Sequence, residues 1–274
     1  NFPEGKVFAG YSNRTYSVEQ MEGIRVVRVK TYIVSNTGFF KRTLDYMSFM
    51  AAGYMAGLIQ ERPDIIIATS PQFFTACAGW ALSTTRRLPF IFELRDLWPA
   101  SIAEVGATNS RWLVRGLEQL ELFLYRRADM IVSVTNAFKE NLIRRGIAGE
   151  KIAVVVNGVN QDLYGEASGK DEALAREHDL DGKFVVGYIG THGMAHGLGS
   201  VLTAAEMMQD DDSIVFLFVG AGAARESLLL EARDKGLKNV RFVSRQPKEM
   251  MPRYWSLCDV SLIHLRNLAL FQSV

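Results

Sequence analysis

Short apolar runs recur along this chain and alternate with segments of helical periodicity. In the first half, runs rich in β-branched residues predict buried parallel strands at 64–68, 89–93, 130–134 and 152–156. Between them, apolar residues at helical spacing predict helices around 44–58, 113–124 and 136–145. Strands that alternate with helices in this way predict an α/β fold with a doubly wound sheet.

The same alternation begins again in the second half. Strands are predicted at 184–189, 214–219, 240–243 and 259–263, with helices near 197–209, 223–235 and 247–257. A polar stretch separates the two halves and predicts an interdomain connection at 161–182. We therefore expect two Rossmann-like domains, 1–160 and 183–274, which face a cleft lined by the carboxyl ends of their strands.

Composition narrows the class of protein. The 274 residues are 48% hydrophobic and 22% charged, which is typical of a globular protein large enough for two cores. The 31 basic and 30 acidic residues give a net charge of +1, which argues against a nucleic-acid partner. No apolar run reaches the roughly 18 residues that span a bilayer. Together with Cys77 and Cys258, which are predicted to be buried thiols, this indicates a cytoplasmic protein.

The clearest chemical signal is a glycine-rich loop at Gly190–Gly197, which follows an apolar strand and precedes a helix. Glycine lets a ligand approach the backbone, and the amino end of a helix favours an anion. The spacing matches neither the dinucleotide fingerprint nor the lysine-containing phosphate loop. Both a phosphate site and a plain turn between strand and helix remain open.

A second glycine loop has the same setting. Gly220 and Gly222 follow the next strand, and Arg245 follows the strand after that. These residues, with His196, form a pocket for a charged ligand or merely turn the chain. His192 and His196 are four residues apart, but the neighbouring glycines predict a loop and nothing nearby completes a ligand set. We therefore expect no metal there.

A polar cluster follows the predicted strand at 89–93. Arg95 is suited to binding a phosphate or carboxylate, Asp96 to accepting a hydroxyl proton, and Trp98 to stacking on a sugar. The alternative is a structural ion pair with Trp98 in the core. No arrangement for covalent catalysis emerges from residue spacing.

Basic and aromatic residues interleave between Arg25 and Phe49. Such a surface is suited to anionic lipid headgroups, where cations attract and apolar side chains insert. A helix that packs its aromatic residues on the sheet gives the same pattern. Both interpretations remain open.

These motifs together resemble the family 4 retaining glycosyltransferases of the GT-B fold, in the branch that builds bacterial surface polysaccharides such as lipopolysaccharide and capsule. The resemblance covers nearly the whole chain and includes transferases of N-acetylfucosamine-type sugars. It is carried by five segments: 3–11, 93–99, 156–159, 190–198 and 218–222.

The resemblance implies a role for each domain. The amino-terminal domain would bind the acceptor, and the carboxyl-terminal domain a nucleotide-sugar donor, usually a UDP-sugar, without a metal or other cofactor. Implied catalytic residues are Arg95 and Asp96, and Glu93, Trp98 and Asn157 lie on the acceptor side or in the cleft. Implied donor-binding residues are Gly190, Thr191, His192, Gly193, His196, Gly220, Gly222 and Arg245.

The chain also departs from the family pattern. Thr191 and His196 stand where relatives commonly carry arginine and lysine, and Arg95 stands where a catalytic histidine is common. Relatives also have a strand and glycine loop before the position of Asn1, and donor-binding glutamates beyond Val274. We therefore expect the sequence to be part of a longer protein.

The expected function is transfer of a sugar from a nucleotide diphosphate to a lipid-linked or glycan acceptor, with retention of configuration. Contact with the inner face of the cell membrane would fit a lipid-linked acceptor. Two alternatives are a non-catalytic binding module, or half of a split enzyme, and a nucleotide-sugar epimerase of the same fold.

Overall fold

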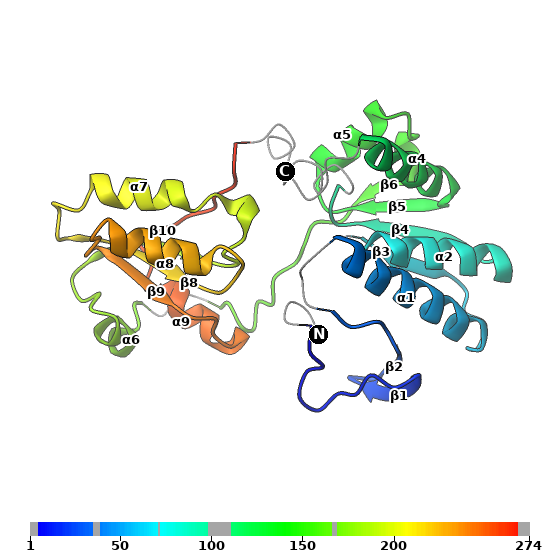
Figure 1. Cartoon of the computed structure of the whole chain (residues 1–274), viewed down its shortest axis with the longest axis horizontal. Helices are drawn as coiled ribbons and strands as arrows, with labels where there is room; N and C mark the ends of the chain where they lie inside the picture. Colours follow the sequence, from blue (N-terminus) through cyan, green and yellow to red (C-terminus); the bar gives the residue numbers. More distant parts are fainter. Residues whose placement is uncertain (1–4, 35–38, 71, 98–110, 166–168, 268–274) are drawn as a thin grey trace. The chain divides into compact units, whose positions relative to one another are not determined.

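The structure is a computed structural model that describes residues 5–34, 39–70, 72–97, 111–165 and 169–267. The chain divides between Asn157 and Gly158 into two compact units (Figure 1). Of the described residues, those up to Asn157 form unit 1 and those from Gly158 onward form unit 2. Each unit is built on its own parallel sheet, which confirms the predicted α/β class.

The sheet of unit 1 has four parallel strands in the order β3-β4-β5-β6. They are β3 (Ile66–Thr69), β4 (Phe90–Leu94), β5 (Met130–Ser133) and β6 (Ile152–Val154). The described helices are α1 (Phe39–Leu58), α2 (Phe73–Arg86), α4 (Arg111–Arg127) and α5 (Asn136–Arg144), with a short 3₁₀ turn, η1 (Gly149–Lys151). Phe92 of β4 packs edge-on against Tyr125 of α4, with ring centroids 5.0 Å apart. This contact fixes one face of β4, the strand that leads to Arg95 and Asp96.

Unit 1 also contains an antiparallel hairpin, β1 (Tyr16–Met21) and β2 (Ile24–Val29), which the sequence analysis did not predict. Glu22 and Gly23 turn the chain with φ of 50° and 82°, as the favoured two-residue hairpin turn requires. The basic and aromatic run from Arg25 to Phe49 is therefore not one helix, because its first part is β2 and its last part is in α1.

The sheet of unit 2 has the order β10-β7-β8-β9, again all parallel. The strands are β7 (Phe184–Ile189), β8 (Ile214–Val219), β9 (Val240–Val243) and β10 (Val260–Ser261). The helices are α6 (Glu172–Glu177), α7 (Gly199–Met207), α8 (Arg225–Asp234) and α9 (Met251–Ser256), with 3₁₀ turns η2 (Met194–His196) and η3 (Lys248–Met250).

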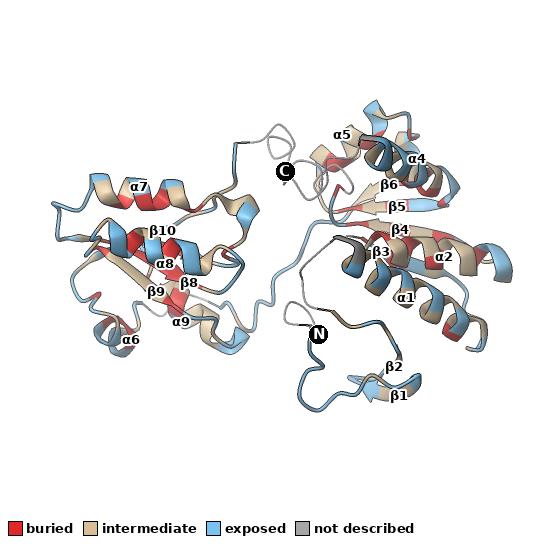
Figure 2. Ribbon diagram, in the orientation of Figure 1, coloured by how far each residue is buried: buried red, intermediate tan, exposed pale blue. Residues whose placement is uncertain are grey.

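Two apolar clusters cover the two faces of this sheet. Residues of α7 and α8 pack on one face against Tyr188, Phe216 and Phe218. Residues of α6 and α9 pack on the other face against Val185, Leu217 and their neighbours. Figure 2 shows the buried positions on α7, α8 and β8. Helices therefore pack on both faces of β7 and β8, and this packing fixes the position of the loops that follow these two strands.

The segment 161–182, expected to be an interdomain connection, is partly built into unit 2. Asp171 caps α6 by accepting a hydrogen bond from the backbone N–H of Leu174. Leu174 and Leu180 belong to the same buried cluster as β7 and β8. This stretch has few apolar residues, and these residues pack it against the sheet of unit 2.

Within the described ranges, no helix has both the length and the apolar character needed to cross a membrane.

Candidate functional site

The carboxyl edge of the unit 2 sheet brings together the two glycine loops. Ile189 pairs with Val219 and Val219 with Val243, so β7, β8 and β9 end side by side. The N–H of Gly190 donates to Val219 O at 2.9 Å, and the N–H of Gly220 donates to Val243 O at 3.0 Å. The loops after these strands therefore share the edge where parallel α/β sheets bind ligands.

The two loops are also bonded to each other beyond the sheet. The N–H of His192 donates to Ala221 O, and the N–H of Ala224 donates to His192 O, both at 2.9 Å. A Cβ built on Gly220 would stand 1.9 Å from the carbonyl oxygen of Gly190. Only glycine allows this approach, so Gly220 has a structural reason to be present that does not depend on a ligand.

The side chain of His192 is buried, which differs from its expected role as a direct contact to a donor. Its exposed fraction is 0%, and its ring lies among those of Tyr188, Phe218 and Phe242. Neither ring nitrogen has a hydrogen-bond partner among the described residues. Burial, followed by the charges of Arg225 and His196, lowers the pKa of His192 to about 4. His192 is therefore neutral near pH 7, and the whole residue is buried between the two glycine loops and the sheet.

Other predicted residues of this loop do lie at its surface. Thr191 is exposed, and its carbonyl oxygen accepts a hydrogen bond from the Tyr188 hydroxyl at 2.8 Å. Gly193 is close to the ring of His196, since a Cβ on Gly193 would stand 2.9 Å from His196 Nδ1. A side chain at position 193 would therefore have to displace that ring.

His264, which no sequence pattern singles out, supports the end of this loop. The Nδ1 of His264 donates to the carbonyl oxygen of His196, and its Nε2 lies 3.0 Å from Ser200 Oγ. The N–H of Arg266 donates to Ala195 O at 2.9 Å. The chain after β10 thus crosses the loop and ties it to the first turn of α7.

Two arginines are near the glycine loops. Arg245 is exposed just after β9, as predicted. Arg225 was not predicted: it is the first residue of α8, and it lies close enough to His192 for its charge to lower the pKa of that ring. The sequence signal for it was only its position three residues after Gly222.

In unit 1, a buried serine organises the predicted polar cluster at the end of β4. Ser70 Oγ accepts hydrogen bonds from the N–H of Arg95 at 2.9 Å and of Asp96 at 3.3 Å. Glu93, inside β4, is half-buried and pairs in register with Thr69. Ser70 is 2% exposed and was not selected from the sequence, because a lone serine after a strand carries no distinctive pattern.

Asp96 has the most perturbed carboxyl group of this cluster. Loss of water around it raises its pKa, and a backbone hydrogen bond from Leu97 partly offsets this effect. Arg95 is exposed, and so is Asn157 after β6. Trp98 lies outside the described residues. Unit 1 thus holds an arginine and a carboxyl group of raised pKa at the carboxyl edge of its sheet.

No group of three or more His, Cys, Asp and Glu side chains in the described part of the chain is arranged to hold a metal ion. The prediction that function requires no metal is not tested by this arrangement and stays a prediction.

Comparison with protein families gives a match to the glycosyl transferase 4-like domain over residues 7–158, more than half of the chain. The protein belongs to the glycosyl transferase 4-like domain family. The match contains all of the described part of the sheet in unit 1, including the cluster at the end of β4.

Two curated relatives carry related names. The putative colanic acid biosynthesis glycosyl transferase WcaI of Escherichia coli (strain K12) is 24% identical over 273 residues, which are 96% of this chain and 66% of the relative. The probable glycosyltransferase WbjE of Pseudomonas aeruginosa is 20% identical over 179 residues, 65% of this chain and 44% of the relative. This chain thus spans less than two thirds of the length of these relatives.

Solved structures show the fold. Anabaena HepE in complex with UDP-glucose has a TM-score of 0.62 at 17% identity, and the match covers 85% of this chain and 60% of HepE. An Escherichia coli structure described as trehalose-6-phosphate bound with UDP-2-fluoro glucose has a TM-score of 0.68 at 13% identity, covering 93% and 70% of the two chains. The glycosyl transferase 4-like chain therefore has the GT-B fold of these structures.

Proposed function

We propose that the protein transfers a glycosyl group from a nucleoside diphosphate sugar to an acceptor in the biosynthesis of a polysaccharide. Membership of the glycosyl transferase 4-like family and the similarity to WcaI support this proposal. The observation that carries it is the joining of two glycine loops at the carboxyl edge of the unit 2 sheet. There, the loops that begin at Gly190 and Gly220 lie at the edge where such sheets bind ligands.

The proposed donor is a UDP-sugar. The structure of HepE was solved with UDP-glucose, and this chain shares its fold. The glycine loops lead into α7 and α8, whose amino ends favour the negative charge of a diphosphate. Thr191, Gly193, His196, Gly222 and Arg245 are the proposed donor contacts, and His192 supports them from the interior by joining the two loops.

The proposed chemistry is electrostatic. Backbone N–H groups and cations of unit 2 stabilise the departing diphosphate, and the anomeric configuration of the sugar is retained. Unit 1 supplies the acceptor side, where Asp96 accepts the hydroxyl proton and Arg95 orients an anionic group. The raised pKa of Asp96 suits this role, because a carboxylate of higher pKa is a stronger base. No metal or other cofactor takes part in the proposed reaction.

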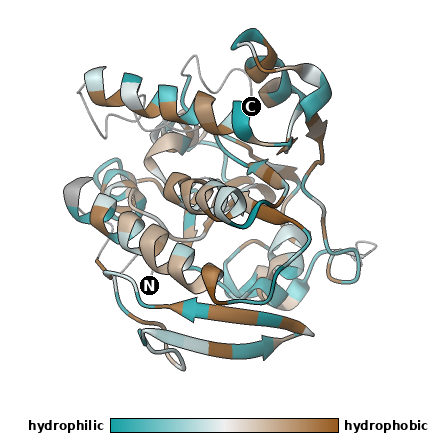
Figure 3. Ribbon diagram, turned by 90° about the vertical axis from the view of Figure 1, so that its right-hand side faces the viewer, coloured by the Kyte–Doolittle hydropathy of each residue, from teal (hydrophilic) through white to brown (hydrophobic). Residues whose placement is uncertain are grey.

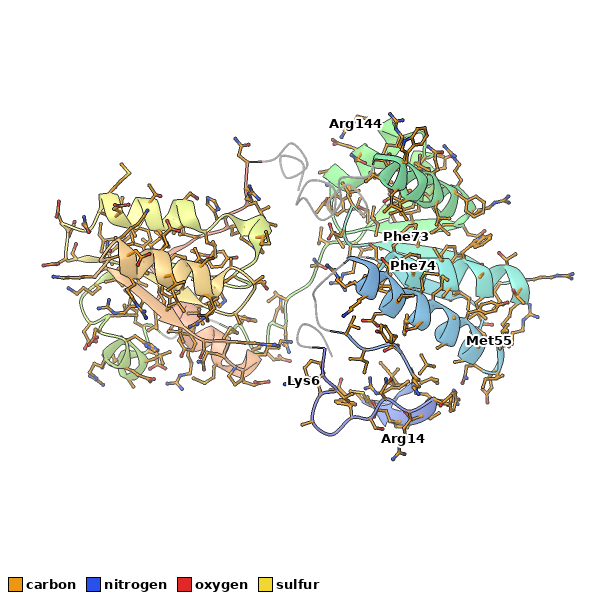
Figure 4. All side chains as sticks on the ribbon, in the orientation of Figure 1. Lys6, Arg14, Met55, Phe73, Phe74 and Arg144 are labelled. Atoms are coloured by element: carbon orange, nitrogen blue, oxygen red, sulfur yellow. The ribbon has the colours of Figure 1, made fainter. Side chains whose placement is uncertain are left out.

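The acceptor side is proposed to rest on the inner face of the cell membrane, with a lipid-linked acceptor. Several apolar side chains of unit 1 are exposed, among them Phe8 at 58%, Ile24 at 67% and Met55 at 62%. Figure 3 shows hydrophobic and hydrophilic positions alternating on the hairpin and on the helices of this side. Figure 4 shows Lys6 and Arg14 on the same unit as Met55. Anionic lipids attract a protein surface that carries both basic and apolar side chains.

An activity assay tests the proposal. Purified protein is incubated with UDP-, GDP- and ADP-sugars, in turn, with a lipid extract or a glycan as acceptor. We expect UDP release that requires the acceptor, continues in EDTA, and gives a product of unchanged anomeric configuration by NMR. Asp96→Asn should abolish most of it. Asp64→Asn is the matched control, because Asp64 is an exposed carboxylate at the opposite end of the same sheet.

Other results would refute parts of this proposal. Acceptor-dependent release from none of the nucleotide sugars would exclude glycosyl transfer by this chain. Conversion of the nucleotide sugar to an epimer without any acceptor would favour the epimerase alternative. Product of inverted configuration would leave transfer standing but exclude retention.

A further inference from the structure

The guanidinium of Arg225 is held at the glycine loops without a matched anion. Its side chain is 21% exposed, and its Nε is buried with no hydrogen-bond partner among the residues described. Its ion pair joins Nη1 to Glu226 Oε1 at 3.8 Å, and the Glu226 side chain is 86% exposed. Such a long, solvated pair contributes little. A buried N–H of a charged group without an acceptor is costly, so an acceptor supplied by a ligand would be favoured at this position.

The backbone of Arg225 connects this charge to the loop itself. Its N–H donates to Gly222 O at 3.1 Å, and α8 begins at this residue. The preceding residue, Ala224, is bonded to His192 O in the other loop. The backbone of Arg225 is therefore fixed relative to both glycine loops, which keeps its side chain within their neighbourhood.

The groups near Arg225 leave its charge uncompensated. His192, from the loop after β7, is buried and neutral, and Arg225 is close enough to lower its pKa. On α8 itself, Glu231 is engaged by Lys235 at 3.2 Å. Hence, within the described ranges, the carboxylates of α8 near the loops are either solvated or already paired.

We propose that Arg225 binds a phosphate group of the donor at the glycine loops and is the main fixed cation of that site. The inference rests on the proposed function, since it assigns a residue to the same donor. The ligand chemistry is that of a diphosphate, which presents several acceptor oxygens to the fork of a guanidinium. Arg245 lies beyond the next strand and is exposed, whereas the Arg225 side chain is only 21% exposed.

Calorimetric titration of the protein with UDP, inorganic pyrophosphate and uridine tests this assignment. We expect Arg225→Gln to weaken UDP and pyrophosphate binding at least about tenfold, with uridine binding unchanged. Arg225→Lys should lose less affinity than Arg225→Gln, because lysine keeps the positive charge. It should still bind more weakly than the unaltered protein, because lysine lacks the forked N–H donors of a guanidinium. Arg233→Gln is the matched control: Arg233 is exposed on the same helix, at its other end, and its replacement should leave all three affinities unchanged.

Each outcome decides between the inference and the function beneath it. If the unaltered protein binds UDP and Arg225→Gln binds it equally well, the inference is wrong and the proposed function stands. If the unaltered protein binds neither UDP nor pyrophosphate, both are wrong. If Arg225→Gln does not fold, an NMR titration of the unaltered protein takes the place of calorimetry on the variant. It follows the ¹⁵N–¹H signal of Arg225 Nε. That signal should move with UDP and with pyrophosphate but not with uridine, and a signal unmoved at saturating UDP refutes the inference.

Discussion

Gly222 lies directly against the backbone of His192. A Cβ built on Gly222 would stand 2.3 Å from the carbonyl oxygen of His192 and 2.9 Å from its nitrogen. Both are backbone atoms: the nitrogen donates a hydrogen bond to Ala221, and the oxygen accepts one from Ala224. They therefore cannot rotate away as a side chain would. The contact between the two glycine loops therefore depends on the missing side chain at position 222.

Gly222→Ala should separate the two loops. We expect a loss of about 1–3 kcal/mol in the free energy of unfolding, as for other overpacked sites, and weaker UDP binding. Gly116→Ala is the control: Gly116 lies in α4 with nothing within 4 Å of a built Cβ. It should gain up to about 1 kcal/mol, because alanine is the better helix former. Thermal unfolding with and without UDP measures both, and equal behaviour of the two variants would show that the loop contact is unimportant.

His192 should make stability depend on pH. The folded protein holds the ring neutral with a pKa of about 4, whereas the unfolded chain takes up a proton near its ordinary value of 6.5. The unfolded state thus binds more protons in this range, and stability is lost as the pH falls from 6.5 toward 4. The loss attributable to His192 is about 3 kcal/mol at most, from the size of the shift. Urea unfolding at several pH values measures it.

His192→Phe supplies the comparison for this pH effect. Phenylalanine fits the aromatic surroundings of Phe218 and Phe242 but has no titrating nitrogen. The difference in stability between the protein and this variant should change as the pH falls below 6.5, in favour of the variant. A difference that stays constant over this range refutes the assignment to His192, whatever the absolute stabilities.

Ser70→Ala should impair function more than its stability cost suggests. It removes the acceptor of the N–H groups of Arg95 and Asp96 and leaves them unsatisfied, at about 1–3 kcal/mol. We also expect at least a tenfold lower kcat/KM, because the proposed base moves with this turn. Ser83→Ala is a matched buried serine, whose hydroxyl donates to Trp80 O within α2. Ser83→Ala should keep kcat/KM unchanged, and an equal loss in both variants would point to general destabilisation instead.

Replacing only one partner of the buried ion pair between Glu121 and Arg145 should lower the free energy of unfolding strongly. Arg145 Nη2 lies 2.6 Å from Glu121 Oε2, and Glu121 also accepts from the Tyr125 hydroxyl at 2.7 Å. Arg145→Met leaves the buried carboxylate without its cation and should cost about 3–5 kcal/mol. Adding Glu121→Gln should restore part of that loss. Chemical denaturation of the two single variants and the double variant measures the coupling, and purely additive losses would deny it.

The strands and helices were largely predictable because their signals are local. Phe184–Ile189, Ile214–Val219 and Val240–Val243 are β7, β8 and β9 with the predicted bounds. The hairpin was missed because it packs weakly: Val18 and Ile24 are exposed, so the strands show no clean alternation of apolar and polar positions. Its stability depends on pairs across strands, such as Arg28 with Glu19, which adjacent sequence does not reveal.

The candidate site was only partly predictable for the same reason. The glycine loops follow from their position after apolar strands. The direction of the His192 ring does not, because it is set by Phe218 and Phe242 on two other strands. Ser70 and His264 bond backbone groups of distant segments, and Arg225 lies close to His192 of the other loop. Their importance therefore becomes visible only once the sheets are assembled.

Amide hydrogen exchange with and without UDP tests the central claim most directly, because it shows both whether the ligand binds and where. We predict that saturating UDP slows exchange in 190–197 and 220–226, and leaves the β1–β2 hairpin of unit 1 unchanged. Uridine alone should protect these two loops less, since it lacks the phosphates. Unchanged exchange in both loops at saturating UDP, or protection confined to unit 1, would contradict a donor site at the glycine loops.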